Sequence, residues 1–308
     1  MSVRSLPLAT NRPGRWQAVQ HLWQIPEQRL ALLLLLPSLL VVLLTMLYPL
    51  IVTIRMALSS ERGQFVGLGN LTRLATTNIF LESMSFTLRF SAFVVIVSLL
   101  LGLGLALVVN SIYVPMKTLW ITILIIPLMV SDIVSAVVWR LMYHPTIGIL
   151  NYALSLVGLP RVDWLGKSST AFFSVGIIEI WRSAPFFFIM LYAALQLIPP
   201  DVYESASVDG AGGVRAFFDM TLPYLRPVMT VALMLQFIGA TRAFGIIVGA
   251  TEGGPGRATW TISYFIYRYA FRAQQMHFAS AAVLVLVLLT IVAGVLFFRF
   301  VWVQRDAA

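Results

Sequence analysis

Long apolar runs constrain this chain more than any other feature, because each is long enough to cross a bilayer. The hydrocarbon core of a membrane is spanned by about 20 apolar helical residues. The runs cover about residues 30–54, 87–109, 119–142, 171–197, 225–248 and 278–303. Only 11% of the residues are charged, well below the roughly 25% usual in soluble domains. The pattern predicts an all-α, polytopic membrane protein with six transmembrane helices.

The first run predicts a retained membrane helix. It is too long for the apolar region of a signal peptide, and no small-residue cleavage site closes it. The polar residues 1–29 carry Arg4, Arg12, Arg15 and Arg29. This cluster favours a cytoplasmic N-terminus. The predicted outer loops carry nearly as many basic residues, so charge alone leaves the orientation open.

Composition argues against several functions. The chain has no cysteine and three histidines far apart in sequence, and it lacks HExxH and GxxxxGK[ST] patterns. We therefore expect no catalytic residues, no metal site, no cofactor in this chain and no nucleotide-hydrolysing loop. The net charge of +9 is spread between the apolar runs, which indicates membrane flanks and not a nucleic-acid surface.

A polar stretch at residues 199–227 separates the fourth and fifth runs. Asp201 and Glu204 have the spacing of a capping box at the start of a short helix. Gly210 is placed to end that helix in the left-handed conformation. A second short helix is predicted at 214–220, stopping before Pro223. We expect a rigid pair of short helices at a membrane surface.

The same stretch carries a family resemblance, at fixed offsets along two dozen positions. The residues are Glu204, Ala206, Asp209, Gly210, Ala211, Phe217, Thr221, Leu222, Pro223, Leu225 and Pro227. Their spacing resembles the cytoplasmic coupling loop, or EAA loop, of ABC importer permeases in the maltose-type carbohydrate branch. Ser205 and Met220 depart from it, where the family usually has alanine and isoleucine. An ordinary connector between two spans is the alternative.

The resemblance implies an ABC type I importer permease fold. Residues 1–29 would be a cytoplasmic segment, 30–303 the permease domain with its coupling loop at 199–227, and 304–308 a tail. The implied partners are a second, different permease chain, two ABC ATPase subunits holding ATP and Mg²⁺, and an extracytoplasmic solute-binding protein. The implied location is a bacterial or archaeal cytoplasmic membrane, with both termini cytoplasmic.

Roles in the coupling loop follow from the resemblance. Glu204 would reach a basic group on an ATPase subunit, and Gly210, after Asp209, would permit the turn. The small side chains of Ala206 and Ala211 would allow the loop and the ATPase subunit to approach each other closely. Leu222 and Pro223 would fix the loop to the fifth span.

Charged and aromatic residues within the spans are candidates for a substrate pathway, since an intramembrane charge usually faces a cavity or a partner. These candidates are Asp132, Trp139, Glu179, Trp181, Arg182, Arg242 and Phe244. Glu179 and Arg182 lie three apart on one helical face and can pair. A purely structural ion pair, a partner interface, and aromatic packing remain open as alternatives.

Three classes of function compete. An intramembrane enzyme lacks a catalytic set. A secondary transporter would show inverted repeats or paired broken helices, and no such repeat is visible. An importer permease remains, for mono- to oligosaccharides or polyols, with glycerol-3-phosphate as the alternative. Gly102, Gly104 and Ala106 in the second run suit close helix packing.

Overall fold

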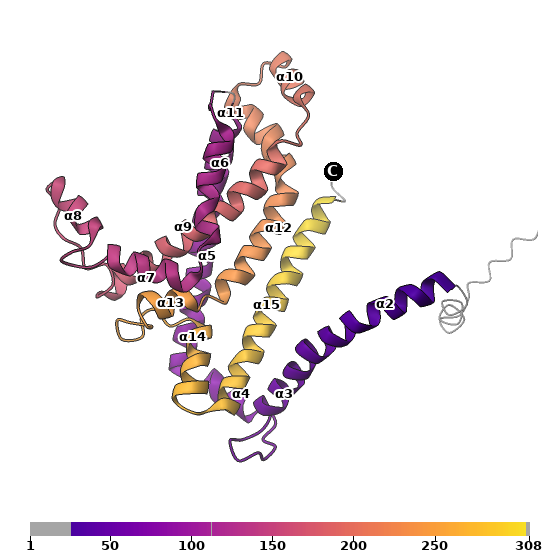
Figure 1. Cartoon of the computed structure of the whole chain (residues 1–308), viewed down its shortest axis with the longest axis vertical. Coiled ribbons are helices and arrows are strands. Elements are labelled where there is room, and N and C mark those ends of the chain that lie inside the picture. Colours follow the sequence, from indigo (N-terminus) through magenta and orange to yellow (C-terminus); the bar gives the residue numbers. More distant parts are fainter. Residues whose placement is uncertain (1–25, 112, 306–308) are drawn as a thin grey trace, which may run out of the picture. The chain divides into compact units, whose positions relative to one another are not determined.

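The computed structural model describes residues 26–111 and 113–305, and it divides the chain into two compact units, 1–55 and 56–308. The predictions on Arg4, Arg12, Arg15 and the last tail residues lie outside the described part. The longer helices are α2 Pro26–Val42, α3 Tyr48–Ala57, α5 Asn78–Asn110, α6 Lys117–Ile125, α7 Asp132–Met142, α9 Ser168–Leu195, α12 Leu222–Thr241 and α15 Met276–Arg305 (Figure 1).

Shorter elements connect these helices. They are α4 Gly69–Ala75, α8 Ile149–Leu156, α10 Pro200–Val208, α11 Gly213–Ala216, α13 Gly245–Ala250 and α14 Ile262–Tyr267, with 3₁₀ or π segments η1 Leu43–Leu47, η2 Ile126–Met129, η3 Phe217–Thr221 and η4 Arg268–Arg272. Apart from one isolated bridge between Ser59 and Phe65, every regular element in the described residues is helical. The all-α prediction is confirmed.

The predicted membrane spans are present with two changes of form. Five stretches are long and apolar enough to cross a membrane, and a bent pair of helices raises the number to six. The five are Leu33–Ala57, Asn78–Asn110, Ser168–Leu195, Gly213–Thr241 and Met276–Arg299.

The third span is broken, whereas the sequence predicted one continuous helix over residues 119–142. The pieces Lys117–Met129 and Asp132–Met142 meet at 99°. Pro127 has no N–H for helix bonding and sits in the 3₁₀ segment η2. Val130 and Ser131 are extended, at ψ 132° and 152°, so α7 begins in a new direction.

The fifth run is also interrupted, whereas the prediction carried one helix to residue 248. Helix α12 ends at Thr241, and α13 begins at Gly245. The Thr261 hydroxyl donates a 2.8 Å hydrogen bond to the carbonyl of Ala243, which satisfies a group freed by the break. Because two spans of this chain are broken, the presence of broken helices does not distinguish a permease from a secondary transporter here.

Helices α5 and α9 form the most extensive contact of the second unit. Gly102 lets their backbones approach, since a Cβ there would lie 2.5 Å from the Phe187 Cβ and 2.9 Å from the Ala184 carbonyl. Gly104 has open space beside it, so of the two glycines expected to pack, only Gly102 does. Ser98 and Ser183 share a buried 2.7 Å hydrogen bond between these helices.

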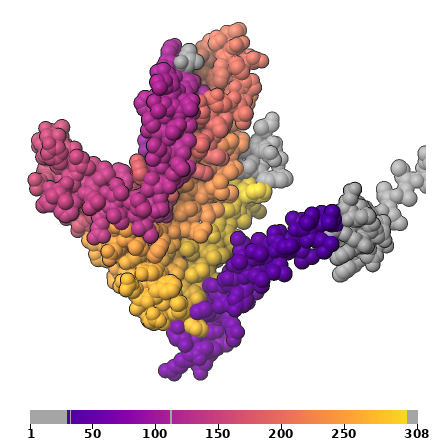
Figure 2. Space-filling model, in the orientation of Figure 1, coloured from indigo at the N-terminus to yellow at the C-terminus, as the bar shows by residue number. Residues whose placement is uncertain are grey.

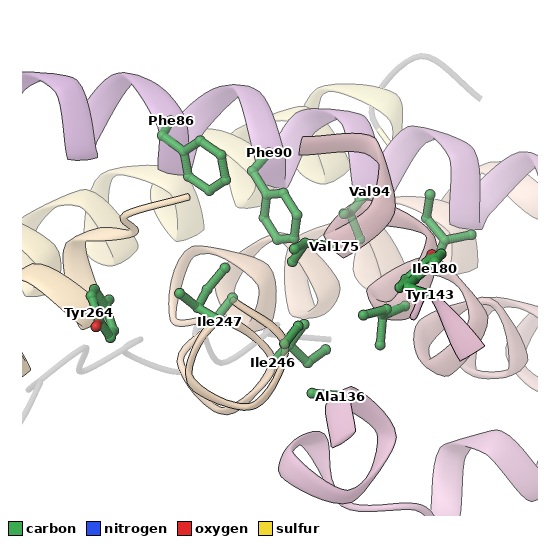
Figure 3. Packing of buried hydrophobic residues seen from close by; sticks show 13 residues of the cluster. Phe86, Phe90, Val94, Ala136, Tyr143, Val175, Ile180, Ile246, Ile247 and Tyr264 are labelled. Carbon is green, nitrogen blue, oxygen red and sulfur yellow. The ribbon is translucent and has the colours of Figure 1, made fainter. Parts of the chain in front are cut away.

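The two broken spans meet through their second pieces, α7 and α13. A Cβ on Gly245 would lie 2.7 Å from the Asp132 Cβ, and one on Gly249 would lie 2.7 Å from the Ala136 Cβ. Ile246 and Ile247 of α13 belong to a buried apolar cluster with α5 and α9 residues (Figure 3). Two glycines four residues apart thus join α13 to α7, as in other close helix pairs.

Two polar residues, Asn151 and His277, hold connecting loops through hydrogen bonds of their side chains. Asn151 accepts hydrogen bonds from the Trp164 Nε1 at 3.1 Å and the Val162 N–H at 3.0 Å. The Nδ1 of His277 lies 3.1 Å from the Met56 carbonyl, and the backbone N–H of His277 donates to the Glu61 carboxylate at 3.0 Å. His277 therefore has a structural role here.

Candidate functional site

The coupling loop, residues 199–227, stands at one end of the second unit, between α9 and α12 (Figure 1). The space-filling view shows it as a projecting surface (Figure 2). The hydroxyls of Tyr203 and Thr221 lie 3.0 Å apart and join α10 to η3. The side-chain amide of Gln196, just before α10, donates to the Asn110 side chain at the end of α5. The first contact braces the loop internally, and the second fixes the chain just before the loop to α5.

The capping-box prediction is wrong at the start of α10. The helix begins two residues earlier, at Pro200 with Pro199 as its cap, and the structure gives no side-chain cap hydrogen bond. Proline suits this position because its fixed φ matches a first helical turn and the missing N–H is not needed there. Asp201 therefore lies within the first turn.

The predicted turn at Gly210 is confirmed in detail. Gly210 has φ +74°, a conformation that costs other residues about 1–2 kcal/mol. The Ala211 N–H bonds the Ala206 carbonyl at 2.9 Å, and the Gly210 N–H bonds the Ser207 carbonyl at 3.1 Å. These two bonds form a Schellman motif. Its closed geometry fixes the direction in which the chain leaves α10.

The second short helix was predicted to stop before Pro223, but it continues into α12. Residues 213–241 form one helical stretch. Near its start, the π segment η3 widens the helix, and the Leu222 N–H bonds the Phe217 carbonyl. The wider turn accommodates Pro223, whose ring would otherwise clash with the carbonyl four residues back. The loop and the fifth span are therefore mechanically continuous.

The surface of the loop combines exposed carboxylates with exposed apolar side chains. Glu204 and Asp209 are exposed, Ala206 is buried within the loop, and Ala211, Leu222 and Pro223 are half-buried. Large apolar residues missed by the sequence analysis are Val208 (87% exposed), Val214 (76%) and Phe218 (57%). Exposed apolar groups in a polar connector are a signal for protein contact.

The structure brings together three of the charged candidates within the spans. The Nη2 of Arg182 donates to the Glu179 Oε1 at 2.9 Å, and the Arg182 Nε lies 3.2 Å from the Asp132 Oδ1. The second contact is an ion pair without hydrogen-bond alignment. Glu179 is nearly buried, whereas the Asp132 side chain is 44% exposed. We call Asp132, Glu179 and Arg182 the interior charged cluster.

Two of the aromatic candidates, Trp139 and Trp181, contact each other. The rings of Trp139 and Trp181 meet edge to face, with centroids 6.0 Å apart. Trp139 lies on α7 seven residues after Asp132, and Trp181 directly precedes Arg182. Trp181 is 37% exposed. This ring contact joins α7 to α9, the two helices that also carry the interior charged cluster.

Two candidates lie away from the cluster. Phe244 packs against Tyr267, with ring centroids 5.2 Å apart. Arg242 is exposed and lines a hollow of about 330 Å³ between α12 and α15, together with Val287 and Thr290. A further ion pair, at 3.7 Å, joins Arg140 to Glu252. The seven pathway candidates therefore do not form one site.

Among the described residues, no group of three or more His, Cys, Asp or Glu side chains could hold a metal ion. The interior carboxyl groups bind a guanidinium and do not face a nucleophile. Such a cluster can hold helices in register and offer hydrogen-bonding groups to a passing solute.

Broken and unbroken apolar helices, an internal charged cluster and a rigid hairpin at one end define a multi-pass membrane transport subunit. Residues 98–304 match the family model described as "binding-protein-dependent transport system inner membrane component". The chain belongs to this family, the permease subunits of ABC transporters.

Individual relatives agree with this assignment. The trehalose/maltose transport system permease protein MalF of Thermococcus litoralis is 39% identical over 79% of this chain and 84% of the relative. The sn-glycerol-3-phosphate transport system permease protein UgpA of Yersinia pestis is 38% identical over 79% of this chain and 81% of its own. The sulfoquinovosyl glycerol transport system permease protein SmoG of Agrobacterium fabrum is 32% identical over 89% of this chain and 91% of its own.

The fold is also that of a solved importer. A chain of a bacterial ABC transporter that imports the polysaccharide alginate superposes with a TM-score of 0.80 at 25% identity, covering 94% of this chain and 98% of that one. A second structure shows the alginate transporter in complex with an alginate pentasaccharide-bound periplasmic protein. Its matching chain superposes with a TM-score of 0.79 at 25% identity, covering 92% of this chain and 95% of that one.

Proposed function

We propose that this chain forms half of the translocation pathway of an ATP-driven importer for sugars or polyols. A second permease chain completes the pathway, and two ATPase subunits supply all of the ATP chemistry. A solute-binding protein delivers the substrate at the outer face. Both termini and the coupling loop lie on the cytoplasmic side.

One observation carries the coupling role: the rigid, exposed α10 turn is continuous with a long membrane helix. The stretch of 29 residues from Gly213 to Thr241 is about 43 Å long at 1.5 Å per residue. It ends at the break beside α13, which packs on α7. Motion imposed on α10 by an ATPase subunit would therefore reach the interior charged cluster through helices and packed glycines.

A neutral, hydroxyl-rich substrate is supported by the interior charged cluster and by the relatives. Aromatic rings and carboxylates suit the C–H faces and hydroxyls of sugars. Two carboxyl groups face one guanidinium in the cluster, which does not favour a phosphate ester there. The MalF relative of Thermococcus litoralis is named for trehalose and maltose transport.

Replacing Glu204 tests the coupling role. We expect Glu204→Ala to weaken ATPase docking by about 2 kcal/mol, roughly thirtyfold, as for a charged anchor at the centre of an interface. The measurement is co-purification of the ATPase subunits, with transport in proteoliposomes. Ser205→Ala, at the next exposed position, is the matched control. Undiminished assembly and uptake with Glu204→Ala would refute this role.

The substrate class is tested with the complete transporter in lipid nanodiscs. ATPase activity is measured with the binding protein loaded in turn with trehalose, maltose, a polyol or glycerol-3-phosphate. Stimulation by a sugar or polyol is expected. Stimulation by glycerol-3-phosphate alone would replace the sugar assignment.

A further inference from the structure

A hollow of about 790 Å³ opens on the second unit at the end away from the coupling loop. Its walls are the first turns of α5, Ser168 at the start of α9, and the loop from Pro255 to Ala258. The 28 residues of α9 separate Ser168 from the coupling loop by about 42 Å. The hollow therefore faces the opposite membrane surface from α10.

One face of α5 supplies the polar lining of this hollow. Glu82, Ser85 and Arg89 line it and recur at intervals of three and four residues, so they lie along one side of the helix. The Arg89 Nε donates to the Ser85 carbonyl at 3.3 Å. In the described part of the chain, Arg89 has no carboxylate partner.

The opposite wall is a rigid loop that presents Arg257. The hydroxyls of Thr251 and Thr259 lie 2.7 Å apart, and the Thr259 hydroxyl donates to the Gly254 carbonyl at 2.9 Å. The Tyr264 hydroxyl donates to the Glu252 carbonyl at 2.5 Å. These bonds fix the backbone on either side of the loop tip, so Arg257 is held at the wall of the hollow.

The hollow has an excess of positive charge. Arg257 lies 3.6 Å from the Glu82 carboxylate, and both side chains are half-exposed. With Arg89, two guanidinium groups face one carboxylate. Such a pair, exposed to water, contributes little to stability. The Arg257–Glu82 pair leaves other guanidinium N–H groups free to bind carboxylates of another molecule in a bidentate geometry.

We propose that this hollow is the docking site for an acidic segment of the extracytoplasmic solute-binding protein. The proposal rests on the proposed function and adds the surface used. The family is binding-protein-dependent, and the hollow faces the side opposite the ATPase contacts. Its open, charged walls fit a protruding protein segment and not an enclosed solute. The guanidinium groups of Arg89 and Arg257 donate hydrogen bonds to the acidic side chains, and Ser168 also lines the hollow.

The double variant Arg89→Glu with Arg257→Glu tests this in the complete transporter in nanodiscs, using the purified cognate binding protein. We expect the binding-protein concentration for half-maximal ATPase stimulation to rise about tenfold, because charges at the rim of an interface mainly set the association rate. Basal ATPase activity and subunit composition should not change. The salt dependence of stimulation should become weaker.

Arg62→Glu with Arg161→Glu is the charge-matched control, because these exposed residues lie outside the hollow. An equal effect in the control would show that only the overall charge matters and would overturn the proposal. Unchanged stimulation in the double variant would also overturn it and would leave the importer assignment intact. Loss of stimulation by every binding protein, even in the unaltered transporter, would instead count against the proposed function.

A photo-crosslinking residue at Ala258 provides a direct readout. It should form an adduct with the binding protein, whereas the same residue at Tyr113, which is 87% exposed near the coupling-loop end, should not. Adducts at Tyr113 alone would place docking elsewhere.

Discussion

Single residues decide whether the coupling loop is stiff. Gly210 is needed for its positive φ and not for space, because no atom lies within 4 Å of where its Cβ would stand. Ala206 is buried beneath the turn that Gly210 closes. Ala206 and Gly210 therefore determine the shape of the coupling loop, whereas the exposed Glu204 is available to contact another protein.

We predict that Gly210→Pro abolishes transport while the chain still inserts into the membrane. Proline requires φ near −65°, and Gly210 has φ +74°, so the Schellman turn cannot close. Gly212→Pro is the control, because Gly212 already has φ −66°. Uptake is measured in proteoliposomes and insertion by membrane fractionation. Normal uptake in Gly210→Pro would refute the rigid-turn mechanism.

Substitutions in the interior charged cluster should lower the stability of the protein by unequal amounts. We predict that Arg182→Ala lowers stability by about 3–5 kcal/mol, since it leaves two carboxyl groups without their guanidinium. Glu179→Gln keeps a hydrogen-bond acceptor for Arg182 and should cost about 1 kcal/mol. Thermal unfolding of the purified complex measures both. Equal melting temperatures for the two variants would show that the ion pairs do not hold the helices.

At the scale of elements, contact between α5 and α9 depends on one of two neighbouring glycines. We predict that Gly102→Ala destabilises the protein by about 1–3 kcal/mol, the cost of an overpacked contact. Gly104→Ala should be neutral or stabilising by about 1 kcal/mol, because helical glycine is unfavourable. Melting temperatures of the two variants in detergent check this. A larger loss with Gly104→Ala would contradict the packing.

The two breaks are the elements that sequence reasoning missed. Both interrupted runs are apolar enough to read as one span, so hydropathy did not reveal where the chain turns. The signals were local: Pro127 in one run, and Gly245 with Gly249 after Arg242 in the other. Only the structure shows that the resulting short helices, α7 and α13, pack on each other and adjoin the interior charged cluster.

At the scale of the molecule, orientation can be tested directly because the chain has no native cysteine. We predict that Val157→Cys is labelled by a membrane-impermeant maleimide in intact cells. Val208→Cys should be labelled only after the membrane is opened. Both positions are well exposed, at 70% and 87%, so access depends on the side of the membrane. The reverse pattern would place the coupling loop outside and remove the proposed mechanism.

The sequence by itself determined that this chain is an all-α membrane protein with a stiff coupling loop. Span length and composition reflect the thickness and low polarity of the bilayer, and the turn at Gly210 depends on one residue's backbone freedom. Both are local properties.

The tertiary structure decided which candidates meet. Asp132, Glu179 and Arg182 come together because α7 turns through 99° after α6, and Arg242 is left on another surface. The hollow between Glu82 and Arg257 likewise joins residues 175 positions apart. Contacts of this kind depend on the path of the backbone between distant segments, and periodicity along a chain does not encode that path.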